Sequence, residues 1–152
     1  MPNPKILIAI HYMHLGGAEI SLIGLLQTLD PQKVDIDLFV YSHEGELMKF
    51  IPDYVNLLPE EKPYSMLEKP LVEVCKSGYL CIAMARLYAK FYRKIKGIVD
   101  NSGHEFTSLY TVKFLPDIQP DVNYDLAISF LTPHTYVRDK VRAEKKNRLD
   151  TY

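Results

Sequence analysis

The chain has 152 residues, of which 47% are hydrophobic and 24% charged, as in a globular protein with one well-formed core. Its formal net charge of −1 provides no overall positive field, so nucleic acid is not an expected partner. Cys75 and Cys81 would lie on different faces of one helix, which argues against a disulfide and favours a reducing compartment. No apolar run has the length of a signal peptide or a membrane span. We therefore expect a single cytoplasmic domain over residues 1–152.

Residues 1–30 predict a strand, a glycine turn and a helix. The apolar run Ile6–Ile10 lacks polar alternation, which is typical of a parallel strand buried on both faces. Gly16 and Gly17 can adopt positive φ and let an anionic ligand approach the start of the following helix. Glu19 complements the helix dipole but would repel a phosphate unless it turns aside or binds a sugar hydroxyl. The turn is therefore either a ligand contact or only a β–α connection. Leucines spaced three and four apart form the apolar stripe of the helix: Leu22, Leu25, Leu26 and Leu29.

Strand and helix patterns alternate along the rest of the chain, which predicts an α/β fold with a parallel sheet and right-handed crossovers. We expect further strands at 34–41, 55–58 and 124–130. The expected helices are a short one at 46–51, a long one at 71–99 that breaks near 77–78, one at 106–115 and a last one that begins at 132–133. A loop at 59–70 and a linker at 116–123 connect these elements.

The segment 75–99 combines an apolar stripe with a concentration of positive charge and contains no acidic residue. In the expected arrangement the stripe packs on the sheet and the charges face water. The alternative is a basic amphipathic helix over 79–98 that lies on an anionic membrane, with Arg86, Lys90, Arg93 and Lys94 facing the lipid. The stripe consists of Leu80, Met84, Leu87, Phe91, Ile95 and Ile98.

Other chemical patterns are incomplete. His11 and His14 have no third ligand at metal spacing, so no metal site is expected. Ser129, His134 and Asp139 lack the glycine elbow of a hydrolase triad. The first turn lacks the G-x-G-x-x-G spacing of nicotinamide-binding domains, so no cofactor is expected. His134 follows the carboxyl end of a strand, where open α/β sheets bind ligands.

Three segments in order resemble the family 4 group of bacterial glycosyltransferases. The first is Lys5–Ile10 followed by Gly16–Glu19 and a leucine-rich helix. The second is the strand at 34–41 that runs into Ser42–Leu47, with its EGEL helix start. The third is Tyr124–Thr132, which reads YDLAISFLT. The resemblance covers most of the chain and implies a Rossmann-like domain that forms one half of a GT-B fold.

The resemblance also implies a function. In such enzymes the N-terminal domain mainly binds the acceptor, and a C-terminal domain that 1–152 lacks holds most of the nucleotide-sugar site. The implied partners are a nucleotide-sugar donor and a glycan or lipid-linked acceptor in cell-surface polysaccharide synthesis. No catalytic residue can be named. Residues implied to line the cleft lie in the glycine turn and at the end of the strand at 124–130: Gly16, Gly17, Glu19, Ser129, Phe130 and Thr132, beside His134.

The chain departs from this family at 147–152, which is polar where the family has an apolar strand ending in a histidine segment. We expect the fifth strand to be missing or badly formed, and a chain of this length to be inactive in sugar transfer. Two other functions remain open. One is a non-catalytic module that docks on the inner face of the membrane through 79–98, and the other is a nucleotide-binding regulatory domain.

Overall fold

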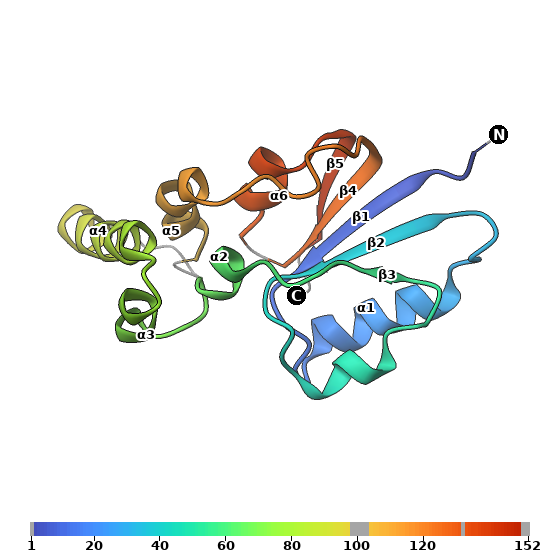
Figure 1. The fold of residues 1–152 in the computed structure, drawn as a ribbon, viewed down its shortest axis with the longest axis horizontal. Coiled ribbons are helices and arrows are strands. Elements are labelled where there is room, and N and C mark those ends of the chain that lie inside the picture. Colours follow the sequence, from blue (N-terminus) through green and yellow to red (C-terminus); the bar gives the residue numbers. More distant parts are fainter. Residues whose placement is uncertain (1, 98–103, 132, 150–152) are drawn as a thin grey trace.

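The computed structural model describes residues 2–97, 104–131 and 133–149, and these form an α/β Rossmann-like fold (Figure 1). A five-stranded sheet, parallel throughout, has the order β3-β2-β1-β4-β5. The predicted sheet class is thus confirmed. The strands are β1 (Lys5–Ile10), β2 (Asp35–Val40), β3 (Asn56–Leu57), β4 (Tyr124–Phe130) and β5 (Ala143–Leu149).

The strand order creates a switch point between β1 and β4. From β1 the chain adds β2 and β3 on one side, and then crosses over to add β4 and β5 on the other. Ile8 of β1 is paired with both Leu38 and Ile128, so β1 lies at the centre of the sheet. In open α/β sheets, ligands bind beyond the carboxyl ends of the strands at such a point.

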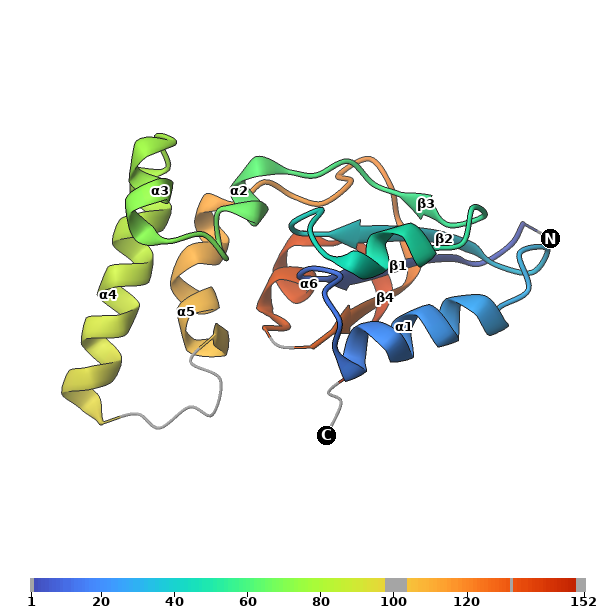
Figure 2. The same cartoon turned by 90° about the horizontal axis from the view of Figure 1, so that it is seen from below.

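Helices lie on both faces of the sheet and beyond its carboxyl end (Figures 1 and 2). One face is covered by α1 (Gly17–Thr28) and the 3-10 helix η1 (Glu46–Phe50). The other is covered by α2 (Lys62–Ser65), the 3-10 helix η2 (Val112–Phe114) and α6 (Thr135–Lys140). Beyond the carboxyl ends of the strands lie α3 (Leu71–Lys76), α4 (Leu80–Lys96) and α5 (His104–Thr111).

Alternation along the strands fills a separate core on each face of the sheet. On one side Ile8, Ile10 and Leu38 pack against Leu22 and Leu26 of α1, as the leucine spacing predicts. The core on the other side is richer in aromatic residues and contains Leu7, Phe39, Tyr41, Tyr64 and Tyr136.

A buried carboxylate links four strands on the aromatic side. Asp37, 5% exposed, accepts a hydrogen bond of 2.6 Å from the Tyr124 hydroxyl and one of 2.7 Å from the Asn56 amide. Lys5 Nζ lies 3.5 Å from the same carboxylate. Burial raises the pKa of Tyr124, and its hydrogen bond to Asp37 raises it further, so the tyrosine remains a donor.

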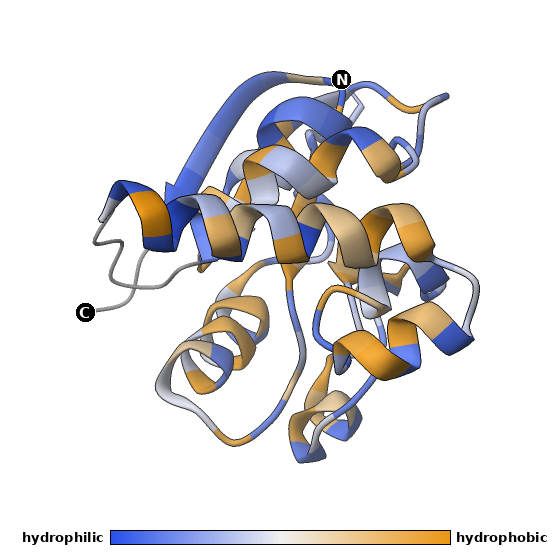
Figure 3. Ribbon diagram, turned by 90° about the vertical axis from the view of Figure 1, so that its left-hand side faces the viewer, coloured by the Kyte–Doolittle hydropathy of each residue, from blue (hydrophilic) through white to orange (hydrophobic). Residues whose placement is uncertain are grey.

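The apolar stripe of α4 faces outward, so the expected packing of this stripe on the sheet is wrong. The helix packs on α3 and α5, and its buried side consists of Ile82, Ala83, Ala85 and Ala89. Small side chains let helices approach closely, which explains why this side is the buried one. Figure 3, viewed onto the helix, shows hydrophobic turns alternating with hydrophilic ones along its outer side. Ile98 lies outside the described residues. The exposed members of the stripe are Leu80, Met84, Leu87, Phe91 and Ile95.

The fifth strand is present, which corrects the expectation that it is missing. β5 is paired with β4 along its length, with Asn147 opposite Ile128 and Leu149 opposite Phe130. Its sequence is polar because it is an edge strand whose residues after Ala143 are all exposed. An apolar pattern is required only where a strand is covered by other elements.

Several predicted boundaries also change. The long helix breaks near Gly78, which has φ 85°, as anticipated, and gives α3 and α4. The segment 59–70 contains α2 and is not wholly a loop. The last helix begins at Thr135, with His134 at the N-cap position, and not at Pro133. Thr132 lies outside the described residues.

Candidate functional site

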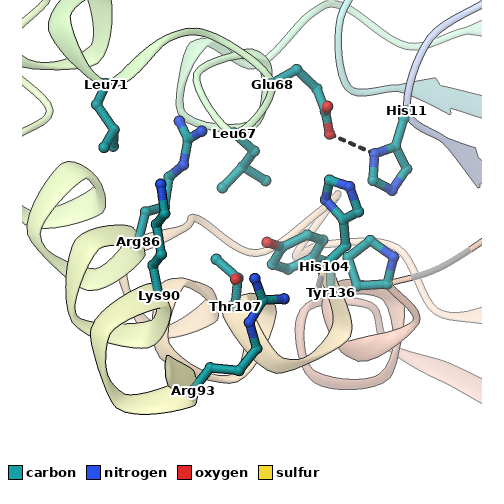
Figure 4. Close-up of a pocket in the computed structure, with 11 residues that line it drawn as sticks. His11, Leu67, Glu68, Leu71, Arg86, Lys90, Arg93, His104, Thr107 and Tyr136 are labelled. Carbon is teal, nitrogen blue, oxygen red and sulfur yellow. Dashed lines mark hydrogen bonds and ion pairs between the residues drawn. The ribbon is translucent and has the colours of Figure 1, made fainter. Parts of the chain in front are cut away.

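A cavity of about 410 Å³ opens at the carboxyl ends of β1 and β4, the switch point of the sheet (Figure 4). Its volume lies within the usual range for small-molecule sites, roughly 300–1,000 Å³. His11 follows β1, and Pro133 and Tyr136 follow β4. The remaining wall comes from the α2–α3 segment, α4 and α5: Leu67, Glu68, Leu71, Arg86, Lys90, Arg93, His104 and Thr107.

A histidine–carboxylate pair closes the sheet side of this cavity. His11 Nδ1 lies 2.7 Å from Glu68 Oε1, and the imidazole, 8% exposed, also packs against the Tyr41 ring. Partial burial raises the pKa of Glu68, but the hydrogen bond with His11 and the electrostatic interactions with His11, His104 and Arg86 more than offset it. The pKa of Glu68 therefore lies below its ordinary value. His11 Nε2 is buried and has no hydrogen-bond partner among the described residues.

Three cations line the opposite side of the cavity. Arg86, Lys90 and Arg93 lie on successive turns of α4. Arg86 Nη1 donates hydrogen bonds of 3.2 and 2.7 Å to the carbonyls of Met66 and Lys69, which ties α4 to the α2–α3 segment. Arginine, lysine and acidic side chains among the described lining residues number three cations and one carboxylate, an excess of two positive charges. Such a surface attracts anions.

The glycine turn differs in detail from its prediction. Gly16 is extended (φ −149°, ψ 162°), and neither Gly16 nor Gly17 has positive φ, so that part of the expectation is wrong. A Cβ at Gly16 would overlap the carboxylate of Glu19, which is 5% exposed. Glycine at 16 therefore leaves room for a buried carboxylate at the start of α1. This carboxylate opposes the binding of an anion there.

Glycine is required instead at Gly45, where φ is 118° and a Cβ would overlap the backbone of Met13 and His14. The Met13 N–H donates a 2.8 Å hydrogen bond to the Glu44 carbonyl, and the Leu47 N–H donates one of 2.9 Å to the Met13 carbonyl. The loop after β1 and the EGEL segment after β2 therefore interlock through their backbones. Gly45 is the residue in the sequence that indicates this contact, because only glycine fits its positive φ and its close approach to the Met13 backbone.

A second cavity, of about 220 Å³, lies between α6 and β5 and contains two of the predicted site residues, Ser129 and His134. Glu105 of α5 also lines it, and accepts 2.9 Å hydrogen bonds from the His134 N–H and the Thr135 hydroxyl. Phe130 is buried in the core on the α1 side.

The structure therefore separates the predicted site residues. Gly16, Gly17 and Glu19 lie at the start of α1 and line neither cavity, whereas Ser129 and His134 line the smaller one. Arg86, Lys90 and Arg93, considered in the sequence as lipid-facing, line the larger cavity, and Lys94 is exposed outside it.

Sequence reasoning missed Glu68, His104, Thr107 and Tyr136, because the cavity draws single residues from segments far apart in the chain. The sequence spacing of His11 bears only on metal binding and does not predict its place in the cavity wall. Among the described residues, no group of three or more histidine, cysteine or acidic side chains is placed to hold a metal.

No protein-family model, curated protein or solved structure matches this chain. Within residues 2–97, 104–131 and 133–149, no helix combines the length and apolar character needed to cross a bilayer.

Proposed function

We propose that this chain is the acceptor-side domain of a nucleotide-sugar-dependent glycosyltransferase that acts on a glycan or lipid-linked acceptor. The observation that carries the proposal is the cavity at the β1–β4 switch point of a Rossmann-like sheet. The three segments that resemble the family support it as well. They contain β1, β2 and β4, three neighbouring strands whose carboxyl ends meet at one edge.

The cavity lining suits a ligand that is partly apolar and partly polar. Leu67, Leu71 and Tyr136 supply apolar surface, while His11 and Glu68 form a fixed polar pair. An acceptor-side domain has to hold its ligand in one orientation so that a hydroxyl faces the donor. A partly buried pair held at 2.7 Å, together with a bulky apolar wall, provides such restraint.

Saturation-transfer difference NMR tests this function with the full chain and three sets of compounds: glycans and short-chain lipid-linked saccharides, nucleotide sugars, and free nucleotides. We expect magnetic saturation to pass from the protein to the glycans and lipid-linked saccharides of the first set, which would show that they bind. Leu71→Trp, which fills the cavity, should abolish this transfer. The matched control Val72→Trp changes the next residue, which is 67% exposed and outside the cavity lining, and should bind as the unmodified chain does. Binding of free nucleotides alone would contradict the proposal and favour a nucleotide-binding regulatory domain.

The outward stripe of α4 favours a second function, docking on an anionic membrane at its inner face. Met84, Leu87, Phe91 and Ile95 are each 57–70% exposed. Lys94 is one turn from Phe91, and α4 contains no acidic residue. A helix with an apolar face, flanking cations and interfacial aromatic residues binds anionic lipid surfaces. The two functions are compatible, because the stripe and the cavity lie on different sides of α4.

Vesicle co-sedimentation tests the docking. We expect the chain to bind vesicles that contain phosphatidylserine, but not vesicles of phosphatidylcholine alone, and to release them at high salt. The pair Met84→Ser and Phe91→Ser should abolish binding. The pair Ile20→Ser and Phe114→Ser, which removes exposed apolar side chains from other elements, should not. The docking would be contradicted if the chain bound neither vesicle type but self-associated, and if the Met84→Ser and Phe91→Ser pair abolished that self-association. That result would show that a second copy of the chain covers the stripe.

A further inference from the structure

The cations of the larger cavity are spaced to act together. Arg86, Lys90 and Arg93 are separated by four and three residues, so they lie on one side of α4. Seven residues of helix rise about 10 Å, which lets a ligand with more than one anionic group contact different turns. In Figure 4 the Arg93 side chain extends from α4 toward α5, the element that carries Thr107.

Within the part of the chain that the structure describes, little compensates the charge of these cations. Glu68 is the one carboxylate among the described lining residues, and it is already hydrogen-bonded to His11. Within the described part of the chain, no ion pair of 4 Å or less involves Arg86, Lys90 or Arg93. Bringing three like charges together in a cleft costs free energy that a bound anion would recover.

Part of the site is also preorganised. The two carbonyls that accept hydrogen bonds from Arg86 fix its guanidinium before any ligand binds. Leu67 and Leu71 lie beside it, so apolar surface adjoins the cationic surface. Guanidinium and ammonium groups are the usual partners of phosphate oxygens, and a neighbouring apolar wall suits the organic group esterified to that phosphate.

We propose that this cavity binds the phosphate or diphosphate group of the acceptor, with Lys90 and Arg93 as direct contacts and Arg86 as the fixed cation beside them. The inference rests on the proposed function only in calling the ligand an acceptor. The site would accept the same group from a phosphorylated lipid or from a free phosphate compound.

Titration of the ¹⁵N-labelled full chain, followed by NMR, tests the site with inorganic pyrophosphate, farnesyl diphosphate and farnesol. We expect both diphosphates to shift the amides around the cavity, and farnesol to shift none. Tighter binding of farnesyl diphosphate than of pyrophosphate would identify a lipid-like ester as the source. Equal binding would identify the phosphate group alone. The pair Lys90→Glu and Arg93→Glu should weaken binding at least tenfold, because about 1.4 kcal/mol is tenfold and a hydrogen bond to a charged group contributes about that much or more.

The matched control is the pair Lys94→Glu and Lys96→Glu, which makes the same change of charge on the same helix outside the cavity lining. This control pair should weaken diphosphate binding much less than the Lys90→Glu and Arg93→Glu pair does. If the cavity pair does not fold, the single changes Lys90→Gln and Arg93→Gln replace it. Equal losses in both pairs, or no diphosphate binding by the unmodified chain at millimolar concentration, would overturn the proposal. Diphosphate binding without saccharide binding would instead contradict the glycosyltransferase function and leave the anion site standing.

Discussion

The hydroxyl of Tyr124 on β4 donates a 2.6 Å hydrogen bond to Asp37 on β2, so the two side chains together span the intervening strand β1. Neighbouring strands are about 4.8 Å apart, and the tyrosine side chain, the hydrogen bond and the aspartate side chain together cover two such spacings. The contact fixes β4 against β2 at the switch point that separates the two halves of the sheet.

Tyr124→Phe removes this hydrogen bond and keeps the ring. Because Asp37 is buried and loses a donor, we expect the free energy of unfolding to fall by about 1–3 kcal/mol, measured by urea denaturation. Tyr88→Phe, at a residue that is 53% exposed, is the control and should change stability little. Equal stability of Tyr124→Phe and the unmodified chain would contradict the role given to this contact.

Gly45→Ala tests the interlocked loops. A side chain at φ 118° is strained, and its Cβ would overlap the Met13 backbone, so we expect a loss of more than about 1 kcal/mol. Gly24→Ala is the matched control. That glycine lies within α1 with no atom near its absent Cβ, and the change should stabilise the chain by up to about 1 kcal/mol. Thermal unfolding followed by circular dichroism compares the two.

The His11–Glu68 pair should make stability depend on pH. The pKa of Glu68 in the folded chain lies below its value of 4.5 in the unfolded chain. Its contribution is therefore complete above about pH 4.5 and is lost as the pH falls through the folded-state pKa. Denaturation of the unmodified chain and of Glu68→Gln between pH 3 and 7 should show stability curves that converge at the acid end. Curves that stay parallel throughout would exclude the pair as a source of acid sensitivity.

Glu105 holds the start of α6 through two hydrogen bonds, to the His134 N–H and the Thr135 hydroxyl. Glu105→Ala should cost about 1–2 kcal/mol, as the loss of a helix cap does. In the Glu105→Ala variant, exchange of the backbone amide hydrogens should become faster in α6 than in the unmodified chain, and should change less in β1. Glu73→Ala, at an exposed position in the first turn of α3, serves as the control. Unchanged exchange in α6 would indicate that the helix is held by its buried side chains alone.

The elements whose pattern reflects burial were predicted well. β1 and β4 are buried central strands, and the leucine spacing of α1 matches its contact with the sheet. β5 was missed because an exposed edge strand needs no apolar pattern, and its pairing with β4 is made by the backbone.

The orientation of α4 was mispredicted for a different reason. A helical stripe shows that one face is apolar, but not that this face is the buried one. The buried side of α4 consists of Ile82 and three alanines, a signal of close helix contact that the larger residues obscured. That reversal directs Arg86, Lys90 and Arg93 into the cavity, so the candidate site followed from an orientation that the sequence alone did not determine.

The two edges of the sheet differ in a way that governs how copies of this chain meet. β3 is only two residues long, and β5 presents Glu144, Lys145, Lys146 and Arg148 along its exposed length. A strand from another molecule would find too little backbone on one side and a row of charge on the other. Growth by edge-to-edge pairing, the route to fibrillar aggregates, is therefore disfavoured at both ends of the sheet.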